Sequence, residues 1–443
     1  MIHKIRFGYA TNSSSTHSVV LYSGANPPPN ELPGDDQFGW EDFTLSTPEG
    51  KKAYIDSQWE HAKGVEEPGM GIDHQSVWCW PRDISTGAVS QDFYEILLKE
   101  IVENPKALVL GGNDNGGEHY LSSGEKTRPH PLWQCLHNGQ SVVRKDPKGW
   151  VTYLGSNYWD KPQGFKIRFG DGDGKKSTLP ELMDLKITDQ CGYGCKFCYQ
   201  GSTPYGKHAT RYKLNQAVKV LKDLQVMEVA IGGGEPTTHP DFISFTQALK
   251  TSGIIANVTT KNKDWVKNRN RWRTEDGITG VGFSVSSAAE VERNYFSTRV
   301  YHVVMGVTPL EEVRRIILKA NHVLLLDFKT TGRGLSYPVH DYSELVPLLR
   351  AAKQLKLQDF DEEDDPEKSW SIGIDTPLAK RFEKELAEAG IPEVYYETEE
   401  GKHSAYWDLV KGEFGPSSYN PSAMVKIPKG AKAEWFAEQF AKW

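Results

Sequence analysis

The sequence lacks the features that mark membrane proteins, secreted proteins and general nucleic-acid binders. Its 443 residues contain no run of roughly 18 or more apolar residues, the length that a membrane-spanning helix needs. Residues 1–24 have no apolar core of the kind found in secretory signals. The formal net charge of -7 and the isoelectric point near 6.0 give no basic signature for nucleic acid. We therefore expect a cytoplasmic protein that does not contact a membrane and for which nucleic acid is a disfavoured partner.

Cysteine is also scarce: the chain has only five, an odd number. Three of them, Cys191, Cys195 and Cys198, fall within eight residues, while Cys79 and Cys135 lie far upstream. This distribution argues against a disulfide framework, which needs paired cysteines and an oxidising compartment. A metal or cluster site is the better interpretation of the triplet.

Residues 1–165 contain few long periodic segments and are rich in Gly, Pro, Asn and aromatic residues. Short apolar runs in this region predict strands, and one amphipathic run predicts a helix. We interpret the region as an accessory α+β domain. The expected strands are 18–22, 107–110, 140–144 and 150–154, and the expected helix is 91–102.

Residues 166–355 alternate apolar runs with amphipathic runs and so form six strand–helix units. Such alternation predicts parallel β/α packing. Six units are too few to close an eight-fold barrel, so the expected fold class is α/β with an open, partial (β/α)6 barrel. The expected strands are 182–187, 228–231, 254–260, 281–285, 301–306 and 322–328, and the expected helices are 213–224, 242–249, 263–271, 288–295, 310–319 and 342–355.

An acidic run, 359–367, follows the barrel and is interpreted as a solvated linker. Beyond it, a strand is expected at 370–374 and a helix at 377–389. The sequence thus predicts three parts in chain order: the N-terminal accessory region, the barrel and a small C-terminal extension, 356–443.

The decisive motif is C-x3-C-x2-C, which directly follows the apolar strand 182–187. Thiolates bind iron strongly, and Gly192 and Gly194 permit the tight backbone path that wraps three sulfurs around one face of an iron–sulfur cube. Three cysteines leave the fourth iron of a 4Fe–4S cluster free to bind a cofactor or substrate. The alternatives are a structural zinc site completed by His208 and a chance grouping of structural cysteines.

The cysteine spacing, Phe197 just before the third cysteine and the preceding strand resemble the radical S-adenosylmethionine (radical SAM) superfamily. A glycine turn alone is common in loops, but here strand 228–231 runs into a segment similar to the superfamily's GGEP element. The resemblance covers residues 182 to about 330. It implies that this segment holds the amino group of the methionine moiety of S-adenosylmethionine (SAM), through Gly232, Gly233, Gly234, Glu235 and Pro236.

Softer matches lie at other strand ends, where β/α barrels carry their chemistry. The resemblance implies ribose or carboxylate contacts at Ser284 and Ser286, and an apolar bed for adenine around Met305. Thr259 and Lys261 close the third strand and point toward the same mouth. Each of these residues has a purely structural role as its alternative.

The resemblance also implies a mechanism. Cys191, Cys195 and Cys198 act as the catalytic and metal-binding residues that hold a 4Fe–4S cluster, while SAM chelates the open iron. One electron from the reduced cluster cleaves SAM to methionine and a 5′-deoxyadenosyl radical, which abstracts hydrogen from a substrate. A flavodoxin or ferredoxin is implied as the electron donor, and the enzyme is expected to be oxygen-sensitive.

The remaining cysteines, Cys79 and Cys135, are too few to bind a second all-cysteine cluster. In this the chain departs from the radical SAM peptide maturases that carry a C-terminal auxiliary-cluster domain. We interpret both as buried small hydrophobic residues, with a hydrogen-donor role as the alternative.

Three hypotheses concern the substrate. The favoured one is a peptide or protein, because aromatic-rich loops suit recognition of a polymer, although core packing explains such tryptophans equally well. The second is a small molecule, namely a nucleoside, nucleotide or amino acid, with Lys329 and Arg333 as candidate phosphate ligands. The third is a nucleic acid bound by 261–273, where basic residues alternate with tryptophans. The aromatic argument rests on Trp40, Trp59, Trp78, Trp80, Trp133, Trp150 and Trp159.

Polar residues close to the cysteine motif are candidates for the lining of a substrate cavity. A glycine-bearing loop after the motif could cap such a site. The candidates are Asp189, Gln190, Tyr199, Gln200 and His208.

Overall fold

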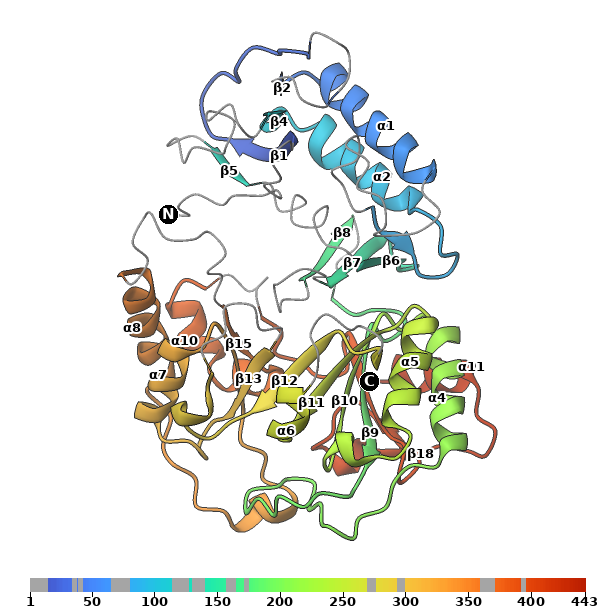
Figure 1. The fold of residues 1–443 in the computed structure, drawn as a ribbon, viewed down its shortest axis with the longest axis vertical. Helices are drawn as coiled ribbons and strands as arrows, with labels where there is room; N and C mark the ends of the chain where they lie inside the picture. The colour runs from blue at the N-terminus through green and yellow to red at the C-terminus, as the bar shows by residue number, and fades with distance from the viewer. Residues whose placement is uncertain are drawn as a thin grey trace. The chain divides into compact units, whose positions relative to one another are not determined.

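The computed structural model divides the chain into two compact units, each described here by itself. The first unit holds the described residues up to Gly170, and the second those from Lys175 onward (Figure 1). None of the described helices is long and apolar enough to cross a membrane. The structure describes residues 15–33, 38, 43–64, 80–113, 127–129, 140–156, 165–170, 175–268, 276–292, 299–358, 371–391 and 396–443.

The described residues of the first unit form two four-stranded sheets and a pair of helices. One sheet has the order β2-β4-β1-β5 and the other β3-β6-β7-β8. The expected strands and helix are all present, although the helix changes to a π-helical turn at its end. The bounds are β1 Ser15–Tyr22, β2 Phe43–Leu45, α1 Pro48–Gly64, β3 Arg82–Asp83, α2 Gln91–Leu97, η1 Leu98–Val102, β4 Ala107–Asn113, β5 Thr127–Pro129, β6 Gln140–Lys145, β7 Trp150–Ser156 and β8 Phe165–Gly170.

Several tryptophans of the first unit form its core. Trp59 and Trp80 are each 8% exposed and Trp150 is 1% exposed. The ring centroids of Trp59 and Trp80 lie 5.3 Å apart, and Trp80 meets Phe93 edge-on. The interpretation of these three residues as a recognition surface is therefore wrong, because burying their large apolar area stabilises the unit. Trp40, Trp78, Trp133 and Trp159 lie outside the described residues, as do Cys79 and Cys135.

The second unit is built on one sheet with the order β15-β14-β13-β12-β11-β10-β9-β16-β17-β18. Strands β9 to β15 pair in parallel, and β16 also runs parallel to β9. The prediction of an α/β fold with a parallel barrel sheet is confirmed. The bounds are β9 Leu182–Thr188, β10 Glu228–Gly233, β11 Ile255–Thr260, β12 Gly280–Ser284, β13 Arg299–Val304, β14 His322–Leu326, β15 Ser371–Ile374, β16 Ser404–Asp408, β17 Glu413–Gly415 and β18 Val425–Lys426.

Helices connect the parallel strands and pack their apolar faces against the sheet. Helix α4 begins at Thr210, whose side chain accepts a hydrogen bond from the Lys213 backbone N–H, and it buries Leu214, Ala217 and Leu221. The bounds are α4 Arg211–Asp223, η3 Pro236–Thr238, α5 Phe242–Thr251, α6 Lys263–Asn268, η5 Ala288–Glu290, α7 Leu310–Lys319, η6 Gly332–Ser336, α8 Leu345–Gln358, α9 Thr376–Arg381, α10 Glu383–Glu388, η8 Pro421–Ala423 and α11 Ala433–Ala441.

The C-terminal residues belong to the same compact unit as the barrel. Strand β15 extends one edge of the parallel sheet beside β14, and β16 adds to the other side of β9. Helix α11 packs beside β16, where the ring centroids of Trp407 and Phe436 lie 4.5 Å apart. The stretch expected as an extension therefore completes the sheet.

The helix expected at 288–295 is wrong, since only the short turn η5 forms there among the described residues. The Glu290 carboxylate accepts hydrogen bonds from the backbone N–H groups of Ser286 and Ser287. These local bonds close the turn and compete with a regular helix. Residues 293–298 lie outside the described part of the chain.

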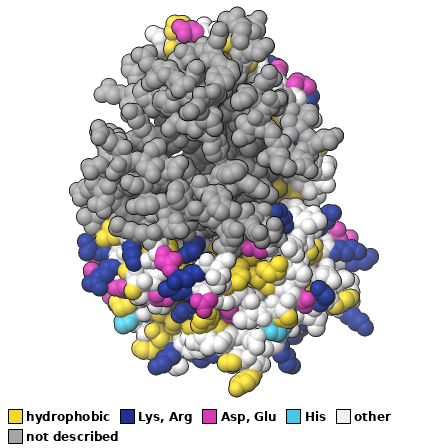
Figure 2. Space-filling model, viewed as in Figure 1, with side chains coloured by type: hydrophobic (Ala, Val, Ile, Leu, Met, Phe, Trp, Pro, Cys, Tyr) yellow, Lys and Arg dark blue, Asp and Glu magenta, His cyan; other side chains and the backbone are white. Residues whose placement is uncertain are grey.

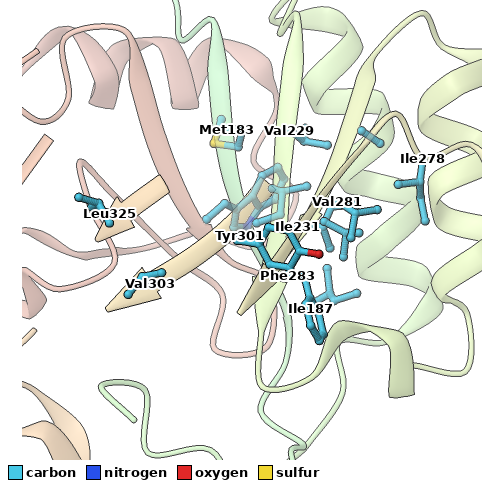
Figure 3. Close-up of a cluster of buried hydrophobic side chains, with 14 of the residues drawn as sticks. Met183, Ile187, Val229, Ile231, Ile278, Val281, Phe283, Tyr301, Val303 and Leu325 are labelled. Carbon is cyan, nitrogen blue, oxygen red and sulfur yellow. The ribbon is translucent and has the colours of Figure 1, made fainter. Parts of the chain in front are cut away.

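Side chains alternate along the strands between two environments. On β9, Met183, Leu185 and Ile187 are buried in the core between sheet and helices, part of which is drawn in Figure 3. The alternate residues, Asp184 and Lys186, therefore point to the opposite face, the interior of the barrel. Polar residues inside an otherwise apolar strand thus mark the face on which a site can form.

Candidate active site

The cysteine loop begins directly after β9, at the C-terminal end of a central strand. Cys191, Cys195 and Cys198 are half-buried free thiols. The Cys198 N–H donates to the Cys195 carbonyl, and Gly194 adopts a φ of 61°, so the backbone curls between the cysteines. Burial raises the pKa of the Cys191 thiol, and the sulfurs of Cys195 and Cys198 add to that rise. The three thiols are therefore near enough to interact.

The loop after β14 holds the cysteine loop in place. The Arg333 side chain donates from Nε to the Cys195 carbonyl at 2.9 Å and from Nη1 to the Ser202 carbonyl at 2.8 Å. The Arg333 backbone N–H also donates to the Cys198 carbonyl. A Cβ at Gly332 would lie 2.3 Å from the Tyr199 carbonyl oxygen, so the two loops touch backbone to backbone. Arg333 is thus a positioning residue for the cysteine loop.

The glycine-rich segment after β10 interlocks with the same loop. The Gly234 N–H donates to the Thr188 carbonyl and the Glu235 N–H to the Gln190 carbonyl, both at 2.7 Å. A Cβ at Gly234 would lie 2.1 Å from the Gln190 carbonyl oxygen. Glycine is required here because any side chain would push the two segments apart.

Glu235 is almost fully buried and connects the ends of β10 and β11. Its Oε1 accepts hydrogen bonds from the Thr260 hydroxyl at 2.6 Å and from the Thr237 hydroxyl and backbone N–H. Its Oε2 accepts one from the Lys261 backbone N–H at 3.0 Å. Lys261 then extends so that its Nζ lies 3.9 Å from the Cys195 sulfur. This places a positive charge beside one of the three thiols.

The arrangement fits a three-cysteine iron–sulfur cluster better than a single metal ion. Among the described residues, no three His, Cys, Asp or Glu side chains converge on one ion position. In a cube, each thiolate binds a different iron, so convergence is not needed. A Cβ at Gly192, Gly194 or Gly232 would meet nothing within 4 Å, which leaves open space beside the thiols.

The zinc alternative required His208 as a fourth ligand. In the structure, His208 Nδ1 shares a hydrogen bond with the Thr188 hydroxyl at 2.8 Å. Its ring packs edge-on against His239 with the centroids 4.8 Å apart. These contacts fix the loop after the cysteine motif and give His208 a structural role.

The other predicted cofactor residues lie in varied surroundings. Thr259 and Ser284 are half-buried at neighbouring strand ends, and Phe197 is half-buried beside the ring of Tyr337. Pro236 is buried and begins η3. The Ser286 backbone N–H is bonded to Glu290, and the Met305 side chain is fully buried in the apolar core. The Met305 side chain therefore exposes no surface that could contact adenine in this structure.

The barrel interior also holds a group of polar residues around Lys329. The sequence predicted Lys329 and Tyr199 as candidates but not the other members. Lys329 lies with its Nζ 4.8 Å from the ring centroid of Tyr199 and 4.7 Å from that of Tyr419. The Tyr419 hydroxyl donates to Glu400 at 2.7 Å. The available signal was Asp184, a charged residue inside an apolar strand; nothing in the sequence connects 400–419 to the barrel.

Part of the second unit is similar to known proteins. Residues 185–352 match the Radical SAM superfamily. The chain is 27% identical over 161 residues to a GTP 3′,8-cyclase of Pasteurella multocida (strain Pm70), an alignment that covers 33% of this chain and 45% of that protein. A GTP 3′,8-cyclase of Actinobacillus succinogenes is 28% identical over the same shares. The chain thus spans less than half the length of these curated relatives.

Solved structures with a similar arrangement include SuiB of Streptococcus suis bound to its precursor peptide SuiA. That match has a TM-score of 0.41 and 15% identity, and covers 55% of this chain and 61% of SuiB. The family match, residues 185–352, and the site both lie within the second unit. Residues 185–352 are thus similar to the radical SAM superfamily, whose enzymes use a 4Fe–4S cluster and SAM.

Proposed function

We propose that the protein is a radical SAM enzyme whose reaction takes place inside the barrel of the second unit. One observation carries the proposal: a loop with three half-buried thiols interlocks with the glycine-rich segment at the C-terminal ends of parallel strands. When bound, the cluster would supply one electron to SAM and so generate a 5′-deoxyadenosyl radical that takes hydrogen from the substrate.

The residues of the chain have distinct tasks in this proposal. Cys191, Cys195 and Cys198 would each hold one iron. Lys261 would place its ammonium beside the cluster, 3.9 Å from the Cys195 sulfur. The backbone of the glycine-rich segment would carry the methionine end of SAM, while Glu235 keeps that segment in position through its four hydrogen bonds.

The test is formation of 5′-deoxyadenosine by anaerobically reconstituted protein with dithionite and SAM. We expect the wild type to form it and Cys195→Ala to form none. Cys79→Ala and Cys135→Ala serve as matched controls, because they remove a thiol outside the motif. If Cys195→Ala retained wild-type formation, the assignment of the cluster loop would be wrong.

For the substrate, we infer a peptide or protein rather than a nucleotide. Two features of the barrel support this. The Arg333 guanidinium is engaged by two backbone carbonyls and so has little left for a phosphate. Lys329 is surrounded by the carboxylates of Asp184, Asp375 and Glu400, which would repel a triphosphate.

The alternative is a small molecule, in particular a nucleotide, because the similar curated proteins are GTP 3′,8-cyclases. Peptide pools and GTP, each added to the reconstituted protein in the 5′-deoxyadenosine assay, would distinguish a peptide substrate from a nucleotide substrate. Stimulation of 5′-deoxyadenosine formation by GTP alone would favour the nucleotide. Among the described residues on the face drawn in Figure 2, basic and acidic side chains are interspersed and form no stripe of one charge for nucleic acid.

A flavodoxin or ferredoxin is proposed as the electron donor, and oxygen sensitivity as a property of the loaded enzyme. Both follow from the need to reduce an open iron–sulfur cluster. Replacement of dithionite by reduced flavodoxin in the assay above tests the donor directly.

A further inference from the structure

The barrel interior holds a charged group that the cluster and SAM leave unexplained. We call it the Lys329 cluster; it comprises Lys329 with the carboxylates of Asp184, Asp375 and Glu400. Lys329 follows β14, Asp184 lies on β9, Asp375 follows β15, and Glu400 precedes β16. The three carboxylates and the ammonium interact electrostatically. Four segments far apart in the sequence thus bring these charges together.

Two of the carboxylates already have partners. Asp375 begins α9 and accepts hydrogen bonds from the backbone N–H groups of Asp327 and Leu378. Glu400 accepts the Tyr419 hydroxyl on one oxygen. Asp375 therefore has a structural role in capping α9. Glu400 has one carboxylate oxygen without a hydrogen-bond partner among the described residues.

Lys329 is held by aromatic rings rather than by an ion pair. Its ammonium lies over Tyr199 and Tyr419, and it forms no hydrogen bond or ion pair with any described residue. Cation–π contacts of this kind stabilise a desolvated ammonium. Burial alone would lower the pKa of Lys329, but the surrounding carboxylates raise it, so the group stays charged.

Asp184 has no hydrogen-bond or ion-pair partner among the described residues. It lies opposite Tyr406 in the β9–β16 register, on the interior face of the sheet. Protein surrounds it deep in the barrel, yet its side chain retains some accessible surface. A carboxylate that is surrounded by protein and still accessible faces an internal space rather than the outer surface.

The Lys329 cluster therefore has too much negative charge. Three carboxylates face one ammonium, and uncompensated charges in a protein interior are costly. Burial raises the pKa of Asp184, of Asp375 and of Glu400, and the single ammonium of Lys329 offsets this rise only in part. A positively charged ligand would satisfy the unused oxygens of Asp184 and Glu400.

We propose that the Lys329 cluster is a substrate-binding site that takes a positively charged group, an ammonium or guanidinium, held by Asp184 and Glu400. This rests on the proposed function and narrows its substrate class. The cation could belong to a lysine or arginine side chain of a peptide or to a small amine. Lys329 in turn would lower the pKa of both carboxylates and so favour their charged form when the site is empty of substrate.

Calorimetric titration of the reconstituted, SAM-loaded full chain tests this with three probes of similar size: n-butylammonium chloride, sodium butyrate and n-butanol. We expect the ammonium to bind about tenfold more tightly than the alcohol, as charged hydrogen bonds in a dry site allow. The peptides Ala-Lys-Ala and Ala-norleucine-Ala, together with GTP, extend the comparison and distinguish a peptide from a small amine.

Asp184→Asn and Glu400→Gln should each remove most of the preference for the ammonium; two variants are used in case one fails to fold. Asp223→Asn, at the exposed end of α4, is the matched control and should retain it. Equal binding of n-butanol or butyrate, tighter binding of GTP than of Ala-Lys-Ala, or an unchanged preference in both variants would overturn the proposal. Unstimulated SAM cleavage by the same wild-type sample would show that the radical chemistry stands even then.

Discussion

At the scale of the residue, buried charges decide most of the behaviour of the second unit. Glu235 and Asp184 are both carboxylates inside the barrel, but their surroundings differ. Glu235 accepts four hydrogen bonds, whereas Asp184 accepts none from the described residues. The first should stabilise the fold and the second should weaken it, because a buried charge is tolerated only when it is paired.

Glu235→Gln tests the first case. The new amide group would present an N–H toward one of the donors that the carboxylate now satisfies, so one buried donor loses its partner. We expect the free energy of unfolding to fall by about 1–3 kcal/mol, measured by urea denaturation. Glu434→Gln, an exposed change on α11, should alter it by less than about 0.5 kcal/mol. Equal effects of the two changes would contradict the structural role of Glu235.

Asp184→Asn tests the second case through its pH dependence. Burial raises the pKa of Asp184 to about 7, above the value near 3.9 of an unfolded chain. The folded state therefore binds the proton more tightly, and stability falls as the pH rises from about 4 to about 7. Asparagine carries no charge and avoids this loss. The variant should melt a few degrees higher than the wild type at pH 8, and the gain should shrink toward pH 4. A gain independent of pH would show that Asp184 is not the titrating group.

At the scale of the element, loops from separate strands position one another around the cysteines. The glycine-rich segment after β10 and the loop after β14 both contact the cysteine loop through backbone atoms. Such contacts tolerate little change, because a backbone cannot move aside as a flexible side chain can.

Gly234→Ala should disturb this packing, since the added carbon would lie 2.1 Å from the Gln190 carbonyl oxygen. We expect a loss of about 1–3 kcal/mol in the free energy of unfolding and a lower iron content after reconstitution. Gly232→Ala is the matched control: the added carbon meets nothing within 4 Å, so stability should remain within about 0.5 kcal/mol. Similar losses in both variants would mean that helix or strand propensity, and not the close contact, is responsible.

Arg333→Lys should loosen the cysteine loop although it keeps the charge. A single ammonium cannot reproduce the two directed bonds that the guanidinium makes to the Cys195 and Ser202 carbonyls. We expect fewer iron atoms bound per chain and faster loss of iron to a chelator. Arg350→Lys, which affects one carbonyl contact on the surface, is the control. Unchanged iron retention in Arg333→Lys would remove the positioning role.

At the scale of the whole molecule, the second unit depends on its last residues. Strand β16 pairs with β9, the strand that leads into the cysteine loop, and Asp408 of β16 forms an ion pair with Lys186 of β9 at 3.3 Å. The rings of Phe414, Phe436 and Phe440 are all fully buried beside it. These contacts make the C-terminal stretch part of the barrel core.

Residues 173–443 expressed alone should therefore fold and unfold in one cooperative transition, followed by circular dichroism. Deletion of residues 403–443 from that fragment should abolish the transition, because it exposes one side of β9 and the aromatic cluster around Phe414. A cooperative transition that survived the deletion would show that β9 to β15 form a self-sufficient core.

The sequence by itself determined the cysteine loop, the glycine-rich segment and the strands and helices of the parallel barrel. These features are local: a spacing of thiols, a turn of glycines and a period of apolar residues can be read within about 15 residues. The same logic failed at 288–295, where side chain–backbone bonds of Glu290 closed a short turn instead of a helix.

Only the tertiary structure decided which distant residues meet. It gave Arg333 and His208 structural partners that the sequence does not place near them: Arg333 binds the Cys195 carbonyl, and His208 Nδ1 shares a hydrogen bond with the Thr188 hydroxyl. It also gathered Asp184, Lys329 and Glu400 from three separate segments of the chain into one charged site. The physical reason is that sheet order and loop packing set these encounters: β16 lies beside β9 although strands β10 to β15 come between them in the sequence.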